Sequence, residues 1–170
     1  ELQIHVIEQV KPSAVIALDT MNFWIENKRD ALMDAVKRVD MLVFNEAELR
    51  EITKEYSLIK AGRQLLEMGP RCIIAKRGEY GVFMMTREEI FLAPAYPLEE
   101  VFDPTGAGDT FAGGLMGYLA NVGDAATESV KQAIVMGSVM ASFNVEDFSV
   151  NRVRMLKPQE HMRRRGLFSR

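Results

Sequence analysis

The sequence has one cysteine, no long apolar run and no excess of basic residues, and each of these absences excludes a class of protein. The single thiol, Cys72, cannot form a disulfide within the chain. No stretch reaches the roughly 18 uninterrupted apolar residues of a membrane-spanning helix, and the first residues lack the cationic and then apolar pattern of a signal peptide. We therefore expect a cytoplasmic protein without a membrane partner.

The charge of the chain argues against nucleic acid as a partner. Its net charge is −3, whereas nucleic-acid-binding domains usually carry a basic excess that meets the phosphate backbone. The one short basic run, Arg163, Arg164 and Arg165, lies close to the C-terminus, where we predict a frayed and solvated tail. Hydrophobic residues make up 48% of the chain, which is enough apolar material for one domain with a core.

What the sequence does contain is an alternation of apolar strands and amphipathic helices. Short apolar runs typical of strands occupy residues 14–20, 40–45, 71–76, 81–86 and 90–95. Helical spacing of apolar residues occurs at the N-terminus and over residues 29–39, 46–53, 59–69, 106–120 and 125–143. This pattern predicts one α/β domain over residues 1–170, with a mostly parallel sheet flanked by helices and an antiparallel ribbon at its end. Cys72 falls in a predicted strand and is expected to be a small buried hydrophobe.

Four junctions follow apolar runs and carry polar or glycine residues: DTMN, FNEAE, KRGEYG and DPTGAGD. Ligands in sheets of this kind bind outside the carboxyl ends of the strands, where loops lead into helices. The four junctions are therefore the candidate ligand site, and their occurrence together weakens the interpretation of DPTGAGD as a simple turn.

The last junction, DPTGAGD, carries the most specific chemistry. A helix that begins at Gly106, Ala107 and Gly108 presents backbone N–H groups without bulky side chains, and its dipole attracts an anion such as a phosphoryl group. Asp109 then lies in the first turn, where a carboxylate can simply be a favourable charge. It can also act as a base that takes the proton of an attacking hydroxyl while the amides stabilise the transferred phosphoryl group.

The segment from Asp103 to Leu115, DPTGAGDTFAGGL, resembles over its full length the C-terminal signature of the ribokinase-like (PfkB) carbohydrate and nucleoside kinases. The resemblance implies a ribokinase-like three-layer sandwich, of which this chain is the C-terminal portion. It also implies an ATP-dependent phosphotransferase that moves the γ-phosphate to a hydroxyl of a sugar or nucleoside. In this interpretation Asp109 is the catalytic base, and the amides of residues 106–109 form the anion hole.

Two other junctions extend the resemblance. In FNEAE, Asn45 and Glu48 match an Asn-x-x-Glu pattern, which implies that they organise Mg²⁺ and the nucleotide phosphates largely through water. In KRGEYG, Gly78 and Gly81 match a segment that passes the nucleotide, and the cation of Lys76 faces either phosphate or solvent. A glycine-containing hairpin turn would account for the second match equally well by itself.

The remaining matches are less regular. DTMN differs from the corresponding Asp-Pro-Asn stretch but leaves Asp19 and Asn22 as candidates, and Ser138 is implied to lie near the adenine. The resemblance also implies that Asp103 and Thr105, a nucleotide-binding candidate as well, help to hold a monovalent cation such as K⁺. The loop over residues 146–149 lacks the glycine that usually completes that cation site, which leaves potassium dependence open.

The resemblance covers nearly the whole chain but only part of the fold of these kinases, since an N-terminal substrate half and its lid have no counterpart. The acceptor sugar or nucleoside therefore cannot be identified from these residues, and a homodimer of the full-length protein is compatible with the resemblance. A noncatalytic nucleotide-binding or interaction module that retains the kinase fold is the alternative function.

Overall fold

The computed structural model describes residues 2–168, which have an α/β fold and group into two compact units. The first unit extends to Arg77 and also includes Phe83–Phe91. The second consists of Gly78–Val82 and the chain from Leu92 onward. Within the described residues, no helix is long and apolar enough to cross a membrane.

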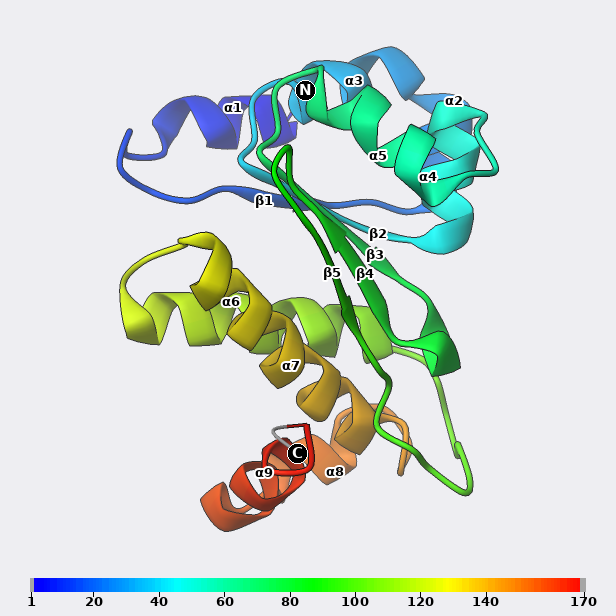
Figure 1. Ribbon diagram of the computed structural model, residues 1–170, viewed down its shortest axis with the longest axis vertical. Helices are drawn as coiled ribbons and strands as arrows, with labels where there is room; N and C mark the ends of the chain where they lie inside the picture. Colours follow the sequence, from blue (N-terminus) through cyan, green and yellow to red (C-terminus); the bar gives the residue numbers. More distant parts are fainter. Residues whose placement is uncertain (1, 169–170) are drawn as a thin grey trace. The chain divides into compact units, whose positions relative to one another are not determined.

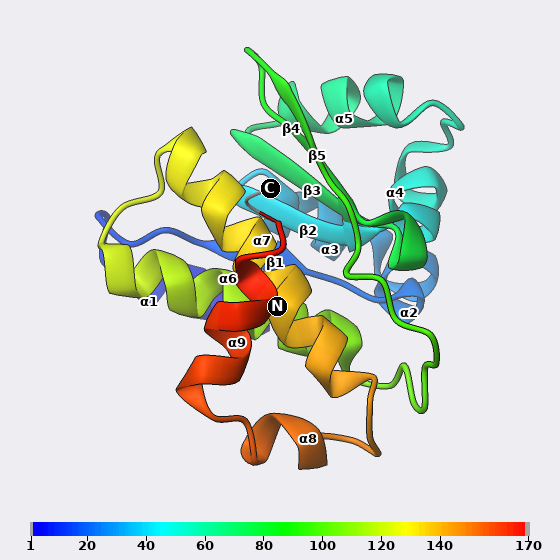
Figure 2. The same ribbon diagram turned by 60° about the horizontal axis from the view of Figure 1, so that its bottom comes forward.

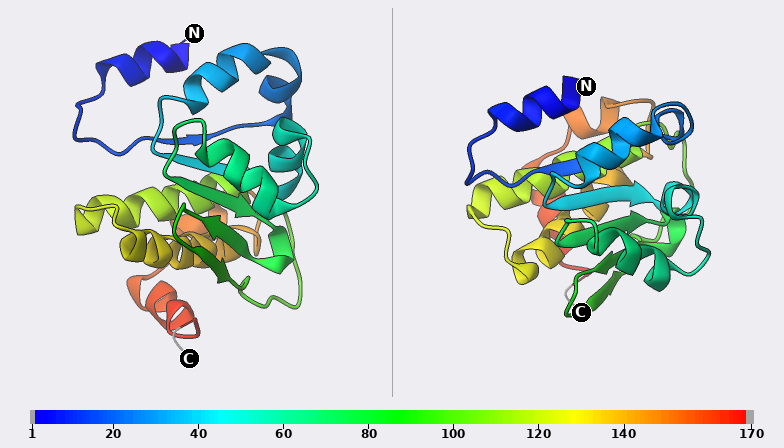
Figure 3. Two further views of the ribbon diagram at one scale, coloured as in Figure 1. Left: turned by 45° about the horizontal axis from the view of Figure 1, so that its top comes forward. Right: turned by 90° about the horizontal axis from the view of Figure 1, so that it is seen from above.

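Five strands form one sheet in the order β1-β2-β3-β4-β5 (Figures 1 and 3). They are β1 (Ala17–Asp19), β2 (Met41–Asn45), β3 (Cys72–Lys76), β4 (Val82–Met85) and β5 (Ile90–Ala93). The first three are parallel, with Asp19 opposite Val43 and Asn45 opposite Lys76. The connections to β4 and β5 are too short for a crossover, so these two strands run antiparallel to their neighbours. The predicted parallel sheet and antiparallel ribbon are confirmed.

The helices of the first unit lie on one face of this sheet, as Figure 1 shows. They are α1 (Leu2–Gln9), α2 (Asn22–Asn27), α3 (Arg29–Val36), α4 (Glu46–Thr53) and α5 (Leu58–Leu66). Alternate strand residues, among them Phe44 and Ile73, pack against helix residues such as Leu49 and Leu65 in one apolar cluster. Since side chains alternate across a strand, Cys72 points to the opposite face, where it is buried. Burial raises the pKa of its thiol to about 12, so it is an inert small hydrophobe as predicted.

The second unit contains the long helices α6 (Ala107–Val122) and α7 (Thr127–Asn144), followed by α8 (Asn151–Arg154) and α9 (Pro158–Arg165). Figure 2 shows α6 and α7 side by side. Glycines allow this close approach: a Cβ on Gly137 would lie 2.8 Å from the carbonyl oxygen of Phe111, and one on Gly114 would lie 3.0 Å from the Cα of Gly137. The α6–α7 contact therefore depends on glycines that let the two backbones pack directly against each other.

The basic run near the C-terminus is not the frayed tail that the sequence suggested. Of the three arginines only Arg163 is exposed, whereas the guanidinium of Arg164 lies 3.6 Å from the ring centroid of Phe143 and 4.2 Å from that of Tyr96. It also pairs with the carboxylate of Glu146 at 2.6 Å. Arginine stacks on aromatic rings and still donates hydrogen bonds at its edge. The prediction was wrong because these partners are distant in the sequence.

Candidate active site

Three predicted site residues occupy the carboxyl ends of the parallel strands in the first unit. Asp19 ends β1, Asn45 ends β2 and Lys76 ends β3, so all three lie at the same edge of the sheet. The ammonium nitrogen of Lys76 is 2.7 Å from Oδ2 of Asp19, and both side chains are partly buried. Lys76 therefore spans β2 and faces a carboxylate, and neither partner is an isolated charge.

The Asn-x-x-Glu segment is a helix-capping device in this structure. Oδ1 of Asn45 accepts the backbone N–H of Glu48 at 2.8 Å, and Oε2 of Glu48 accepts the backbone N–H of Asn45 at 2.9 Å. This reciprocal arrangement is a capping box, and it fixes the start of α4 immediately after β2. It engages one carboxylate oxygen of Glu48 and leaves Oε1 for another role.

Burial raises the pKa of Glu48 above its usual range, and burial is the largest of four influences. The N–H of Asn45 lowers that pKa, the nearby carboxylate of Asp19 raises it, and the ammonium of Lys76 lowers it. The strand ends thus hold two carboxylates and one cation in mutual electrostatic contact. Within residues 2–168, no group of three or more His, Cys, Asp or Glu side chains is arranged to hold a metal ion directly.

Asn22 is placed apart from this ion pair. It is the first residue of α2, a short helix that the sequence did not predict, and its side chain is exposed. Between it and Asp19 lies Thr20, whose hydroxyl is buried without a hydrogen-bond partner in the described structure. The structure therefore brings together Asp19, Asn45, Glu48 and Lys76, and leaves Asn22 at the surface.

In the second unit, the DPTGAGD segment forms the N-terminus of α6. Gly106 is the N-cap residue with φ 80°, a left-handed conformation that glycine adopts at little cost. Among the described residues, no side chain caps this helix start. The N–H of Ala107 donates to the carbonyl of Pro104 at 3.2 Å, so that amide is engaged. Asp109 lies in the first turn and is exposed, beside the uncapped amides.

The loop before α6 is shaped by Asp103. Its Oδ1 accepts the N–H of Thr105 at 2.9 Å. The pKa of Asp103 is lowered, first by that N–H, then by the Thr105 hydroxyl, and also by the backbone N–H of Ser149. The hydrogen bond from Thr105 to Asp103 holds the loop in the conformation that leads into the helix.

The two glycines of KRGEYG differ in what they require. Both have positive φ, 56° at Gly78 and 82° at Gly81. A Cβ at Gly81 would lie 2.0 Å from the carbonyl oxygen of Ala93, whereas one at Gly78 would meet nothing within 4 Å. Gly81 is thus needed for chain packing beside β5, while Gly78 lies in open space at the start of a short 3₁₀ turn.

Ser138 and Asn144 are buried polar residues of α7. The hydroxyl of Ser138, a predicted nucleotide-binding group, has no hydrogen-bond partner in the described structure. Asn144 was not predicted, and it is fully buried with hydrogen bonds to Thr105, Thr110 and Ser149. The only signal in the sequence was an asparagine at the end of an apolar helix, which by itself is typical of a helix terminus.

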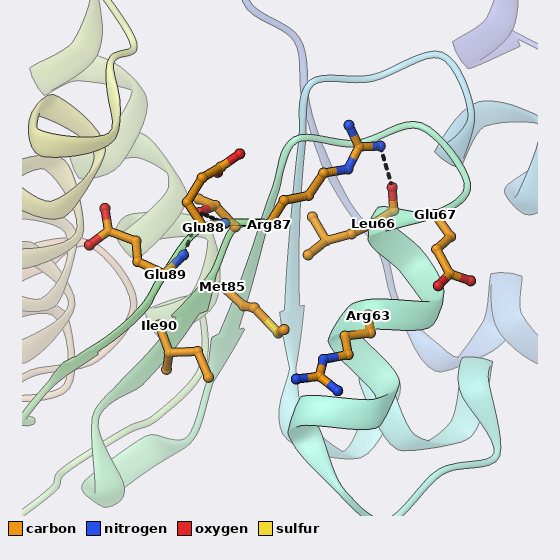
Figure 4. Close-up of a pocket in the computed structure, with 9 residues that line it drawn as sticks. Arg63, Leu66, Glu67, Met85, Arg87, Glu88, Glu89 and Ile90 are labelled. Atoms are coloured by element: carbon orange, nitrogen blue, oxygen red, sulfur yellow. Dashed lines mark hydrogen bonds between the residues drawn. The ribbon is translucent and has the colours of Figure 1, made fainter.

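A cavity of about 470 Å³ lies elsewhere in the first unit (Figure 4). It is lined by the end of α5 and the β4–β5 turn, with Arg63, Arg87 and Met85 among its residues. Because β4 is antiparallel to β3, this turn lies at the edge of the sheet opposite Asp19 and Lys76. None of the predicted site residues lines the cavity.

Comparison with known proteins identifies relatives of the chain. A model of the pfkB family of carbohydrate kinases matches residues 5–154. A cytidine kinase from Thermococcus kodakarensis is 41% identical over 97 residues, which cover 54% of this chain and 34% of the relative. A deoxyribokinase from Salmonella typhi is 34% identical over 122 residues, which cover 69% of this chain and 38% of the relative.

Among solved structures, a nucleoside kinase from Methanocaldococcus jannaschii, described as an archaeal member of the ribokinase family, has a TM-score of 0.77 with this chain. Its sequence identity is 18%, and the match covers 95% of this chain and 51% of that structure. The likeness shows that the fold is ribokinase-like. The chain spans about half of this structure's length and less than half of the length of the two curated relatives.

Proposed function

The chain belongs to the PfkB family of carbohydrate kinases, and from that premise we propose that it carries the nucleotide-binding part of an ATP-dependent kinase. In this proposal the γ-phosphate of ATP moves to a hydroxyl group of a sugar or nucleoside. The related cytidine kinase and deoxyribokinase act on a nucleoside and a sugar, which supports both acceptor classes.

The observation that carries the proposal is the start of α6. A helix N-terminus with a left-handed glycine and no side-chain cap leaves backbone N–H groups directed at solvent, where they attract a phosphoryl oxygen. The amide of Ala107 is engaged by Pro104, so the amides of Gly106, Gly108 and Asp109 are the proposed anion hole. Their dipoles are fixed before the reaction and stabilise the charge of the transferred group.

Asp109 supplies the second requirement, a proton acceptor. The acceptor hydroxyl donates its proton to a carboxylate oxygen of Asp109, its oxygen forms a bond to the γ-phosphorus, and the bond from that phosphorus to ADP breaks. Asp109 then holds the proton until it passes to solvent. Its exposed position in the first turn is compatible with contact to a bound hydroxyl.

The strand ends supply groups for the nucleotide and its metal. Oε1 of Glu48 and the carboxamide of Asn45 are oxygen donors suited to Mg²⁺ that keeps part of its water shell. When bound, Mg²⁺ would neutralise phosphate charge. Lys76 is proposed to attract the phosphates, and Gly78, Gly81, Thr105 and Ser138 are proposed to line the nucleotide.

The test is Asp109→Asn in the full-length protein. The change keeps the shape of the side chain but removes proton acceptance, and because general-base catalysis contributes about 10²–10⁴-fold, kcat should fall at least about 100-fold. ATP affinity, measured by calorimetry, should be unchanged or higher, since a negative charge is lost. Asp124→Asn is the matched control, because Asp124 is also an exposed aspartate but lies beyond the C-terminal end of α6, in the segment that leads into α7.

Gly108→Val tests the anion hole separately. A β-branched side chain at this amide should obstruct the phosphate, so both ATP affinity and kcat should fall. Near wild-type turnover in Asp109→Asn would refute the proposed mechanism. ATP binding without a phosphorylated product from any sugar or nucleoside would instead favour a noncatalytic nucleotide-binding module.

A further inference from the structure

Asn144, the last residue of α7, connects three segments of the second unit through one side chain. Its Nδ2 donates to the carbonyl oxygen of Thr105 at 3.3 Å and to that of Ser149 at 2.7 Å. Its Oδ1 accepts the hydroxyl of Thr110 at 2.5 Å. The side chain has no exposed surface, and both donor hydrogens and the acceptor of its amide are used.

Ser149, one of these partners, is held in an unusual conformation. Its φ is 56°, in the left-handed region that residues other than glycine adopt rarely. Nδ2 of Asn144 donates to its carbonyl oxygen, and the backbone N–H of Ser149 lowers the pKa of Asp103. The backbone N–H of Phe102 also donates to the carbonyl of Val145 at 2.8 Å. The loop after α7 and the loop before α6 are therefore joined by the side chain of Asn144 and by a backbone hydrogen bond.

We infer that Asn144 is a positioning residue for the start of α6, and that its amide joins the two loops at the place where the sequence left a monovalent cation open. The inference rests on the proposed function, because it concerns the amides and carboxylate of residues 106–109. It goes beyond that function by assigning a residue that holds the site and by making the site independent of K⁺.

The oxygens that would bind a cation do not fit that role here. Potassium in proteins is held largely by carbonyl oxygens that replace its water shell. The carbonyls of Thr105 and Ser149 both point to Nδ2 of Asn144, whose hydrogens carry partial positive charge and repel a cation placed between them. Oδ1 of Asp103 likewise already accepts the N–H of Thr105 at 2.9 Å.

The connection to the site is short. A Cβ on Gly106, the N-cap of α6, would lie 3.3 Å from Oδ1 of Asn144, so the two residues are almost in contact. Thr105 precedes this glycine, and Thr110 follows Asp109, so Asn144 holds the chain on both sides of the proposed anion hole. We call the hydrogen bonds of Asn144 to Thr105, Thr110 and Ser149 the tether. If the tether is lost, both residues that flank the proposed anion hole can shift, and its amides lose their fixed directions.

The experiment compares K⁺ with N-methylglucamine in the full-length protein at a constant ionic strength of about 0.1 M. For the unaltered protein we expect the melting temperature, the ATP affinity and kcat to be the same in both salts. A gain of more than about fivefold in ATP affinity or kcat with K⁺ would overturn the inference.

Two variants make the test specific. Asn144→Asp keeps the shape but places an oxygen against the carbonyls of Thr105 and Ser149, so ATP affinity without K⁺ should fall at least about tenfold and K⁺ should restore most of it. Asn144→Ala should lower the melting temperature by about 4–10 °C, because buried partners lose their bonds. Asn121→Ala, an exposed asparagine of α6, is the control and should change neither quantity.

The outcomes separate the two proposals. If Asn144→Asp retains wild-type ATP affinity and melting temperature in N-methylglucamine, the tether is refuted, whatever the catalytic activity. If no acceptor is phosphorylated while ATP binding and melting follow the pattern above, the kinase proposal fails and the tether stands. Should ATP not bind at all, the response of the Asn144→Asp melting temperature to K⁺ still decides the question.

Discussion

Among single residues, Glu48 is a buried carboxylate that also caps a helix and interacts with two other charged groups. The residue is 6% exposed, and its carboxylate accepts a backbone hydrogen bond and interacts electrostatically with both Asp19 and Lys76. A buried carboxylate whose folded-state pKa is raised binds its proton more tightly in the folded protein than in the unfolded chain. The stabilising contribution of Glu48 is therefore fully present below the ordinary glutamate pKa, about 4.3. This contribution is lost as the pH rises through the raised pKa of the folded state.

Glu48→Gln should therefore increase stability at neutral pH. Glutamine keeps an oxygen that can accept the N–H of Asn45, so the capping box survives while the cost of burying a charge disappears. Each tenfold change in the acid dissociation constant corresponds to about 1.4 kcal/mol, so the melting temperature at pH 7–8 should rise measurably. Near pH 4 the difference should vanish. Thermal unfolding across this pH range, followed by circular dichroism, provides the measurement.

The same variant tests the proposed role toward Mg²⁺ in the full-length protein. Removing a charge from the water shell of the metal should raise the Mg²⁺ concentration needed for half-maximal rate. Glu51→Gln removes an exposed carboxylate from the same helix and should leave that concentration unchanged. Equal Mg²⁺ requirements in both variants and the unaltered protein would count against Glu48 as a metal-organising residue.

The local part of this site could be predicted from the sequence, and the remote part could not. Asn45 and Glu48 are three residues apart, so their spacing alone predicts a helix start and offers a candidate metal site. The hydrogen bonds of Asn144 to Thr110 and Thr105 join residues 34 and 39 positions apart. No local spacing records such a contact, and the stacking of Arg164 on Tyr96 was missed for the same reason.

At the level of elements, the strands and the longer helices followed directly from their periodicity. Apolar runs of four residues bounded by polar ones gave the positions of β2 and β3, and the GAGD glycines marked the start of α6. The short helix α2 was missed, because six residues with exposed Phe23 and Trp24 show no amphipathic pattern. Which glycines serve packing was also invisible until α6 and α7 were seen together.

The α6–α7 contact gives a prediction with an internal control. Gly137→Ala should destabilise the protein by about 1–3 kcal/mol, because the added methyl would lie 2.8 Å from the carbonyl of Phe111 and neither backbone can yield cheaply. Gly113→Ala and Gly117→Ala place the same methyl where nothing lies within 4 Å, so they should stabilise α6 by about 0.5–1 kcal/mol. Urea unfolding of the three variants measures these changes. Equal effects at all three positions would show that helix propensity, not packing, governs this contact.

For the molecule as a whole, the outer edge of β1 is the feature that bears most on how the chain associates. Within residues 2–168, β1 pairs only with β2, so its outer edge presents backbone N–H and C=O groups without strand partners. Parallel sheets are usually covered by helices on both faces, but that covering leaves the outer edge of the first strand open. An open edge of this kind is a template for pairing with another chain. The chain matches about half of the solved relative, so these residues do not describe the acceptor site of a whole kinase.

We expect the 170-residue chain, produced alone, to associate through this edge and to show no sugar or nucleoside phosphorylation. Ala17→Lys introduces a charge on β1, which should hinder edge-to-edge pairing and shift the chain toward the monomer in size-exclusion chromatography. Ser13→Lys adds the same charge in the exposed segment before β1 and should leave the association unchanged, which separates edge pairing from a general effect of charge. A monomeric 170-residue chain that unfolds cooperatively and turns over ATP with a sugar would contradict both parts of the expectation, because it would show that the open edge is harmless and that these residues alone provide the acceptor site.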